Sequence, residues 1–294
     1  MSDPRELRLL CVHAHPDDES SKGAATMARY VHEGVRVMVL TCTGGERGSI
    51  LNPALEGNEA LAANIGEVRR REMERAAQIL GIEHRWLGFV DSGFTRDEPE
   101  PAPLPEGCFA LQPLEVTTEA MVRVLRDFRP QVMTTYDESG GYPHPDHLMT
   151  HQVSISALKA AADAEQFAGA GEPWQVSKLY YNSGRWGGLV KMHQAMLDRG
   201  LESPFGEMLE WIAKRPVRLH PPTTTSVDCA RYFTLRDEAL KAHETQVDPD
   251  GRWFKVPMEL QQELAPNEEF TLAGTTIDVT FPETDLFAGL REDA

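Results

Sequence analysis

The feature that most constrains the fold is a short apolar run, residues 7–12, that ends in the segment His-Ala-His-Pro-Asp-Asp-Glu at residues 13–19. The apolar run has the composition of a buried strand. Pro16 has no backbone N–H to donate, so a central strand must end before it. Histidines and carboxylates crowded at the end of a buried strand are costly unless something uses their charge. A divalent cation is the simplest partner, and we expect a metal site there.

Strand-like and helix-like segments alternate over residues 7–181. We expect strands at residues 7–12, 35–41, 85–89, 131–136 and 177–181, separated by helices at 20–32, 61–80, 117–128 and 145–164. The alternation predicts an α/β fold, a Rossmann-like and mostly parallel sheet with helices on both faces. Ligands of such sheets lie beyond the carboxyl ends of the strands, where the strand order reverses.

The alternation weakens beyond about residue 184. Residues 1–184 are predicted to form the catalytic core. Residues 185–294 are predicted to form a smaller α+β portion that completes the substrate pocket and does not fold independently. Its expected elements are helices at 189–198, 205–212, 232–243 and 257–264, a strand at 223–227 and an irregular end. The acidic, proline-rich residues 97–105 are expected to form an extended surface excursion.

A second histidine-rich stretch, Gly-Tyr-Pro-His-Pro-Asp-His at residues 141–147, follows the fourth expected strand. If the strand order is 3-2-1-4-5, the first and fourth strands are neighbours at the point of reversal, and the two stretches meet. His15, Asp18 and His147 are then the expected metal ligands. Two imidazoles and one carboxylate form a usual set for catalytic zinc, and iron(II) accepts similar ligands.

A metal ion in this set lowers the pKa of its bound water to about 7, and a base beside that water is then needed. Asp17 is the expected base, because it adjoins a proposed ligand without having to bind the metal. His144 is expected to face the site from the other side, as an acid or as a charge that stabilises an oxyanion. Asp146 is expected to accept a hydrogen bond from a ligating histidine.

Each of these residues also has an alternative interpretation that involves no metal or catalysis. His15 could cap the following helix, and Asp17 and Asp18 could be acids favoured at a helix N-terminus. The glycine-rich loop at residues 43–48 could be a solvated turn; it lacks the P-loop pattern, and Glu46 is better suited to accept hydrogen bonds from sugar hydroxyls. Arg69 and Asp91 are expected in the same pocket, although each alone could be a surface charge.

Charge and cysteine usage limit the class of protein. The net charge of −17 argues against nucleic acid and anionic membranes as partners. No apolar run is long enough to span a bilayer, and no secretory signal is evident. The four scattered cysteines are expected to be buried reduced thiols in a cytoplasmic protein. These features fit an enzyme with a small-molecule substrate.

Four motifs resemble those of the LmbE/PIG-L family of zinc-dependent de-N-acylases: AHPDDE at 14–19, TGGERG at 43–48, RxxE at 69–72 and HPDH at 144–147. Members of this family hydrolyse an amide on the 2-amino group of a glucosamine unit within a Rossmann-like fold. The resemblance implies one zinc ion per chain on His15, Asp18 and His147. It further implies Asp17 as base, His144 as acid or electrostatic partner, and Tyr142 as a mobile donor to the carbonyl oxygen.

Longer strings, at residues 20–25, 50–54, 86–93, 135–147 and 242–246, are most similar to family members that act on mycothiol S-conjugates. That similarity implies hydrolysis of the amide between S-conjugated N-acetylcysteine and glucosaminyl-inositol, with release of a mercapturic acid. Lys22 at the pocket mouth would suit this longer acyl group, although it could also be a simple surface residue. The alternatives are a deacetylase of N-acetylglucosaminyl-inositol or a related sugar, and a non-catalytic ligand-binding domain.

Overall fold

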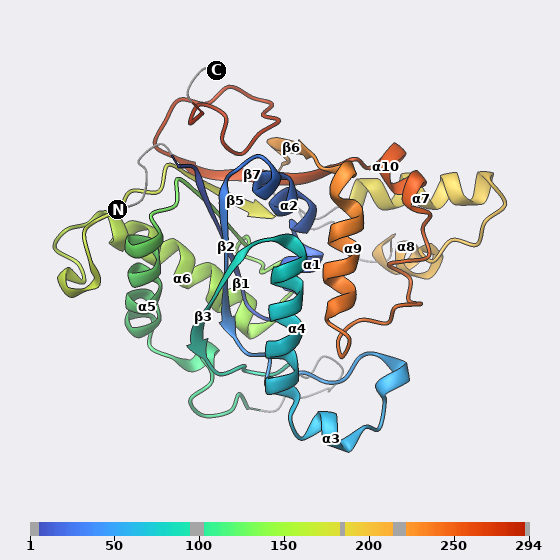
Figure 1. Ribbon diagram of the computed structural model, residues 1–294, viewed down its shortest axis with the longest axis horizontal. Helices are drawn as coiled ribbons and strands as arrows, with labels where there is room; N and C mark the ends of the chain where they lie inside the picture. The colour runs from blue at the N-terminus through green and yellow to red at the C-terminus, as the bar shows by residue number, and fades with distance from the viewer. Residues whose placement is uncertain (1–5, 95–102, 183–185, 214–221, 292–294) are drawn as a thin grey trace.

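The computed structural model describes residues 6–94, 103–182, 186–213 and 222–291 (Figure 1). Its centre is a seven-stranded sheet with the order β3-β2-β1-β4-β5-β7-β6. The strands are β1 (Arg8–His13), β2 (Arg36–Thr43), β3 (Glu83–Phe89), β4 (Val132–Thr135), β5 (Lys178–Asn182), β6 (Thr225–Asp228) and β7 (Asn267–Thr275). The first five strands are parallel and have the expected order, whereas β7 pairs antiparallel with β5 and β6. The α/β prediction is therefore confirmed.

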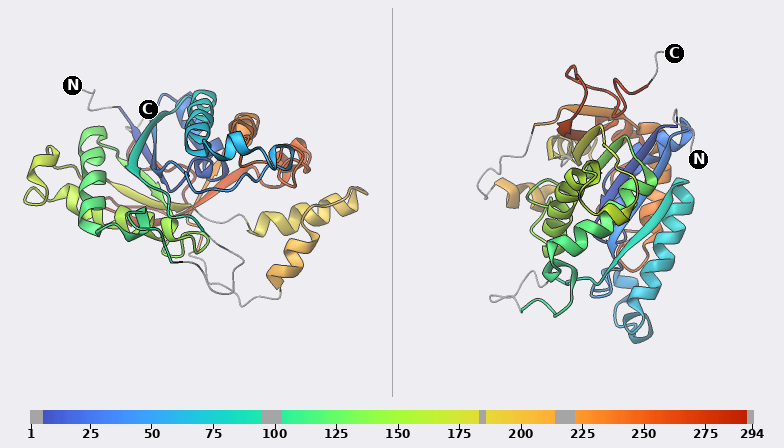
Figure 2. Two further views of the ribbon diagram at one scale, coloured as in Figure 1. Left: turned by 90° about the horizontal axis from the view of Figure 1, so that it is seen from below. Right: turned by 90° about the vertical axis from the view of Figure 1, so that its left-hand side faces the viewer.

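Helices flank both faces of the sheet (Figures 1 and 2). They are α1 (Asp18–Ser21), α2 (Ala24–His32), α3 (Glu59–Ala62), α4 (Ile65–Leu80), α5 (Leu114–Phe128), α6 (Pro145–Ala162), α7 (Trp186–Asp198), α8 (Gly206–Ala213), α9 (Phe233–Ala242) and α10 (Met258–Leu264). Helices α7 and α8 extend away from the sheet (Figure 2). None of the helices in the described ranges is both long and apolar enough to cross a membrane.

Two hydrophobic cores form because successive strand residues point to opposite faces of the sheet. Leu9 and Cys11 of β1 belong to the core that contains residues of α2, α4 and α9. Leu10 and Val12 belong to the core that contains residues of α5 and α6. A strand buried on both faces reads as a continuous apolar run, which is why β1 was recognisable in the sequence.

Several expected boundaries are wrong. The helix expected at 20–32 is two helices, α1 and α2, because Gly23 adopts a left-handed conformation (φ 92°) that interrupts the helix. The helix expected at 61–80 is likewise divided into α3 and α4. Helix α5 begins at Leu114 rather than at the threonines: Thr117 donates to Leu114 O inside the helix, and Thr118 donates to the hydroxyl of Ser156.

The C-terminal portion contains a strand that the sequence analysis missed. The nine residues of β7 lie where an irregular end was expected, and they complete the sheet between β5 and β6. Six of its nine residues are only partly buried or exposed, so it lacks an apolar run. Glu268 is buried within it and accepts a hydrogen bond from Thr26 N at 2.8 Å. The helices expected in this portion are present as α7, α8, α9 and α10.

All four cysteines are buried, and no disulfide joins them, as expected. The expected excursion at residues 97–105 falls largely on residues 95–102, which lie outside the described ranges.

Candidate active site

The carboxyl ends of β1 and β4 carry the two histidine-rich stretches. Parallel pairing of Leu9 with Val132 and of Cys11 with Thr134 places both strand ends at the same edge of the sheet. The stretches at 13–19 and 141–147 therefore meet, as the topology rule predicts for the point where strand order reverses.

His15, Asp18 and His147 form a buried group whose ligand atoms lie within 4.8 Å of one another. Asp18 Oδ2 is 3.6 Å from His15 Nδ1 and 3.4 Å from His147 Nε2. His147 Nε2 is buried and has no hydrogen-bond partner among the described residues. A buried imidazole nitrogen normally has a partner. A divalent cation would be a suitable partner for this nitrogen, because two imidazoles and a carboxylate form a usual ligand set.

The other ring nitrogen of each histidine is held by the protein. His147 Nδ1 is 2.8 Å from Gly140 O, so that nitrogen donates and Nε2 keeps its lone pair. A Cβ at Gly140 would lie 2.8 Å from the Cβ of His147, so this close approach requires glycine. His15 Nε2 is 3.1 Å from Asp146 Oδ2, which leaves Nδ1 free toward Asp18. Both contacts fix the tautomer that a metal ligand needs.

A second group of possible ligands, His15, Asp91, His144 and Asp146, lies against the first. Its carboxylates are already occupied: Asp146 accepts hydrogen bonds from the backbone and side chain of Ser92 as well as from His15. Asp91 accepts from Arg47 N at 3.0 Å and Gly93 N at 2.8 Å. Burial would raise the pKa of Asp91, but the His15 and backbone hydrogen bonds hold it well below its usual range. This group supports His15 rather than forming a separate site.

Asp17 lies at the start of α1, and its carboxylate is partly exposed. Its side chain is 27% exposed, and Oδ2 accepts a hydrogen bond from Arg69 Nη2 at 3.0 Å. Burial raises the pKa of Asp17, and Arg69 opposes that rise without cancelling it. Its backbone has a φ of 100°, a left-handed conformation that is uncommon outside glycine.

His144 and Tyr142 border the same group. His144 Nδ1 accepts a hydrogen bond from Asp146 N at 3.1 Å, so the neutral ring carries its hydrogen on Nε2. Burial, with His15 and His147 nearby, lowers the pKa of His144 to about 3. The ring of Tyr142 is 4.5 Å from that of His147. Burial raises the pKa of Tyr142, which therefore remains a phenol and a donor at neutral pH.

The four expected substrate contacts are engaged with the protein. Lys22 Nζ is 2.5 Å from Asp18 Oδ1. Glu46 accepts from Asp91 N at 3.1 Å. The Arg69 side chain is only 4% exposed and donates to the carbonyl oxygens of Pro16 and Gly45, at 2.6 and 3.1 Å. Arg69 and Asp91 thus hold the loops together, whereas Lys22 and Glu46 remain partly exposed.

Five further residues near the site have no role that the sequence predicts. Tyr136 donates to Asp18 Oδ2 at 2.8 Å, and its ring stacks on His147 with the ring centroids 4.3 Å apart. Glu19 pairs with His243, and Glu72 binds Thr245. Residues 242–246 are part of the similarity to the family. The roles of His243 and Thr245 come from contacts with residues more than 150 positions away, which the spacing of residues does not reveal.

Comparison with known proteins gives the class. The family model described as "PIG-L: GlcNAc-PI de-N-acetylase" matches residues 10–158. A mycothiol S-conjugate amidase from Streptomyces coelicolor is 55% identical over 292 residues, which cover 98% of this chain and 99% of that protein. A 1D-myo-inositol 2-acetamido-2-deoxy-alpha-D-glucopyranoside deacetylase from Geodermatophilus obscurus is 39% identical over 295 residues, covering 96% and 98%.

Solved structures share the fold. The N,N'-diacetylchitobiose deacetylase from Pyrococcus horikoshii superposes with a TM-score of 0.59 at 20% identity, covering 90% of this chain and 83% of that one. Fold, buried donor set and sequence relatives together define an amidase or deacetylase. The chain belongs to the PIG-L family, and the expected LmbE/PIG-L resemblance is confirmed.

Proposed function

We propose that the protein hydrolyses mycothiol S-conjugates at the amide between S-conjugated N-acetylcysteine and glucosaminyl-inositol. The products are a mercapturic acid and the free amine of glucosaminyl-inositol. The observation that carries this proposal is the 55% identity to the Streptomyces coelicolor amidase over 98% of the chain, against 39% to the Geodermatophilus obscurus deacetylase.

We assign one metal ion to His15, Asp18 and His147, with zinc as the expected ion and iron(II) as the alternative that accepts the same ligands. The unpartnered Nε2 of His147 supports this assignment. When bound, the ion supplies Lewis-acid chemistry, which polarises a carbonyl and makes water acidic enough to lose a proton near neutral pH.

Asp17 takes the proton from the attacking water. Its partly exposed carboxylate, its raised pKa and its contact with Arg69 support this role, because a base must be accessible, basic enough and oriented. His144 Nε2–H and the Tyr142 phenol are the donors that stabilise the negative charge on the carbonyl oxygen. The proton on Asp17 then passes to the leaving amine as the C–N bond breaks. His144, the other expected donor, has a lowered pKa that keeps its ring neutral, so it retains the electrostatic role.

We place the acyl group of the substrate toward Lys22, where an ammonium group suits the longer N-acetylcysteine chain. Glu46 is the proposed contact of the sugar, and Arg69 and Asp91 are proposed to hold the loops of its pocket in place. Residues 185–294 are proposed to complete that pocket. Four buried cysteines that form no disulfide support a reducing compartment, the cytoplasm.

The test compares two substrates on zinc-reconstituted protein: a fluorescent mycothiol S-conjugate and N-acetylglucosaminyl-inositol. We expect kcat/KM to favour the conjugate by at least about tenfold, or about 1.4 kcal/mol in transition-state binding. A preference for the acetamide would instead make the protein a deacetylase. This is the second candidate function, supported by the 39% identity to the Geodermatophilus obscurus deacetylase.

Lys22→Met, which shortens the unbranched side chain by one atom and removes its charge, should lower kcat/KM for the conjugate more than for the acetamide. An equal loss on both substrates would remove Lys22 from substrate discrimination.

A further inference from the structure

A buried ion pair joins the C-terminal portion to the loop that carries Asp17. His243 follows α9, and its Nε2 lies 2.7 Å from Glu19 Oε1. Both side chains are fully buried. A charged pair taken out of water is costly to form, and breaking it from one side leaves an uncompensated buried charge. The pair therefore constrains where Glu19 can lie.

Glu19 in turn holds the backbone of Asp17. Its second oxygen, Oε2, accepts a hydrogen bond from Asp17 N at 2.9 Å. Asp17 needs such support because its φ of 100° is a left-handed conformation, which costs a non-glycine residue about 1–3 kcal/mol. The contact with Glu19 is one of the bonds that keeps this conformation in place.

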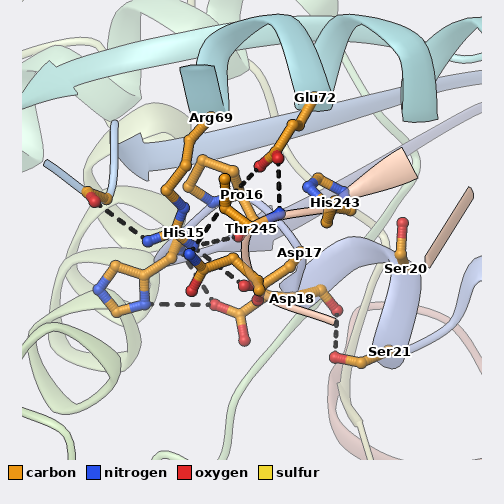
Figure 3. Close-up of polar contacts among 12 residues, drawn as sticks. His15, Pro16, Asp17, Asp18, Ser20, Ser21, Arg69, Glu72, His243 and Thr245 are labelled. Atoms are coloured by element: carbon orange, nitrogen blue, oxygen red, sulfur yellow. Dashed lines mark hydrogen bonds and ion pairs between the residues drawn. The ribbon is translucent and has the colours of Figure 1, made fainter. Parts of the chain in front are cut away.

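A second contact joins the same C-terminal segment to α4, the helix that carries Arg69, the other hydrogen-bond partner of Asp17. Thr245 donates from N and Oγ1 to the carboxylate of Glu72, at 2.7 and 2.8 Å. Glu72 lies one turn after Arg69 on α4, and Arg69 donates to Pro16 O and Asp17 Oδ2. Figure 3 shows His243 and Thr245 beside Arg69, Glu72 and Asp17.

We propose that His243 is a positioning residue that acts through Glu19 to hold the Asp17 carboxylate in place for proton transfer. The inference rests on the proposed function, in which Asp17 is the base. It assigns the C-terminal portion a part in the chemical step: the segment 243–245 fixes both sides of Asp17, one through Glu19 and one through α4.

The test compares two amide side chains of different length at position 243. In His243→Gln the amide nitrogen can occupy the place of Nε2 and still donate to Glu19, whereas in His243→Asn it reaches only the place of Nδ1. Nδ1 has no hydrogen-bond partner among the described residues, so only the first variant keeps the contact. We expect His243→Asn to lower kcat by about 10- to 100-fold with KM changed less than threefold, because small misplacements of a catalytic group have costs of this size. His243→Gln should recover most of that loss.

His243→Asn leaves the buried carboxylate of Glu19 without its ion-pair partner, and this variant could unfold. The double variant Glu19→Gln/His243→Asn removes that buried charge, so kcat can still be measured on folded protein. Its kcat should be reduced by no more than the same 10- to 100-fold, since both changes act through one contact. His32→Asn on α2, an exposed histidine whose ring lies 5.9 Å from that of Tyr232, is the control and should leave kcat unchanged. Zinc content is measured by elemental analysis and should be the same in every variant.

Three results would overturn the proposal. Equal loss of kcat in the Gln and Asn variants would mean that the Nε2 contact is not what matters. Unchanged kcat in His243→Asn would remove the positioning role, and loss of zinc would move the effect to the metal ligands. Failure of the wild-type protein to hydrolyse either substrate would instead refute the proposed function, which separates the two.

Discussion

Tyr136 links the site to the sheet, and its hydroxyl gives the sharpest prediction. The phenol is 2% exposed, donates to Asp18 Oδ2 at 2.8 Å and accepts from Ala14 N at 3.0 Å. Tyr136→Phe keeps the ring that stacks on His147 and deletes only the oxygen. It therefore removes one hydrogen bond to a carboxylate and leaves one buried N–H without an acceptor.

The two losses have separate readouts. A hydrogen bond to a charged group contributes about 1.5–3 kcal/mol, which corresponds to roughly 10- to 150-fold in an equilibrium constant. Because this bond orients the proposed ligand Asp18, we expect zinc affinity to fall by about 10- to 100-fold. The unsatisfied Ala14 N–H should lower the free energy of unfolding of the metal-free protein by about 1–3 kcal/mol.

Zinc affinity is measured by competition with a chromophoric chelator, and stability is measured by urea unfolding of the metal-free protein. Tyr181→Phe is the matched control, because this neighbouring tyrosine packs on His151 rather than on a proposed ligand. If Tyr136→Phe binds zinc within twofold of the wild type while folded, the argument that the phenol orients Asp18 is refuted.

Three further predictions test a ligand, the base and the partly buried His84. His147→Gln should lose zinc by elemental analysis, and full occupancy would exclude His147 as a ligand. Asp17→Asn should keep zinc and lose about 10²–10⁴ in kcat, and full activity would exclude it as the base. Burial lowers the pKa of His84 from 6.5 to about 4, so the unfolded chain binds its proton more tightly than the folded one. The resulting contribution, about 3 kcal/mol, is complete above pH 6.5 and is lost as the pH falls toward 4. His84→Gln should flatten this dependence in urea unfolding at pH 7 and pH 4.5, and an identical slope in both proteins would contradict it.

The strand order and the meeting of the two histidine-rich stretches could be predicted because both follow from local patterns. Strands β1, β2 and β4 are buried on both faces and read as apolar runs. The order 3-2-1-4-5, assumed as usual for this fold class, then makes the ends of the first and fourth strands neighbours. His15, Asp18 and His147 follow those two strands.

The remaining features depend on contacts between distant parts of the chain. Arg69 is an arginine on an arginine-rich helix, and only the fold reveals that its guanidinium is buried against Pro16 O and Gly45 O. His243 and Thr245 acquire their roles from Glu19 and Glu72, which precede them by more than 170 residues. The sequence does not predict β7 because the strand has no apolar run. Its extended backbone is stabilised by hydrogen bonds to β5 and β6, which only the fold reveals.

The late position of β7 in the sequence bears on how the protein forms during synthesis. β5 leaves the ribosome with one edge unpaired, and β6 leaves with no strand beside it, since both pair with β7. Unpaired strand edges are templates for association with other chains, and non-local pairing is slow. Once β7 is inserted, it covers the open edge of β5, and β6 covers Asn267–Phe270 on the other side of β7. The nascent chain is thus most open to aggregation just before β7 arrives.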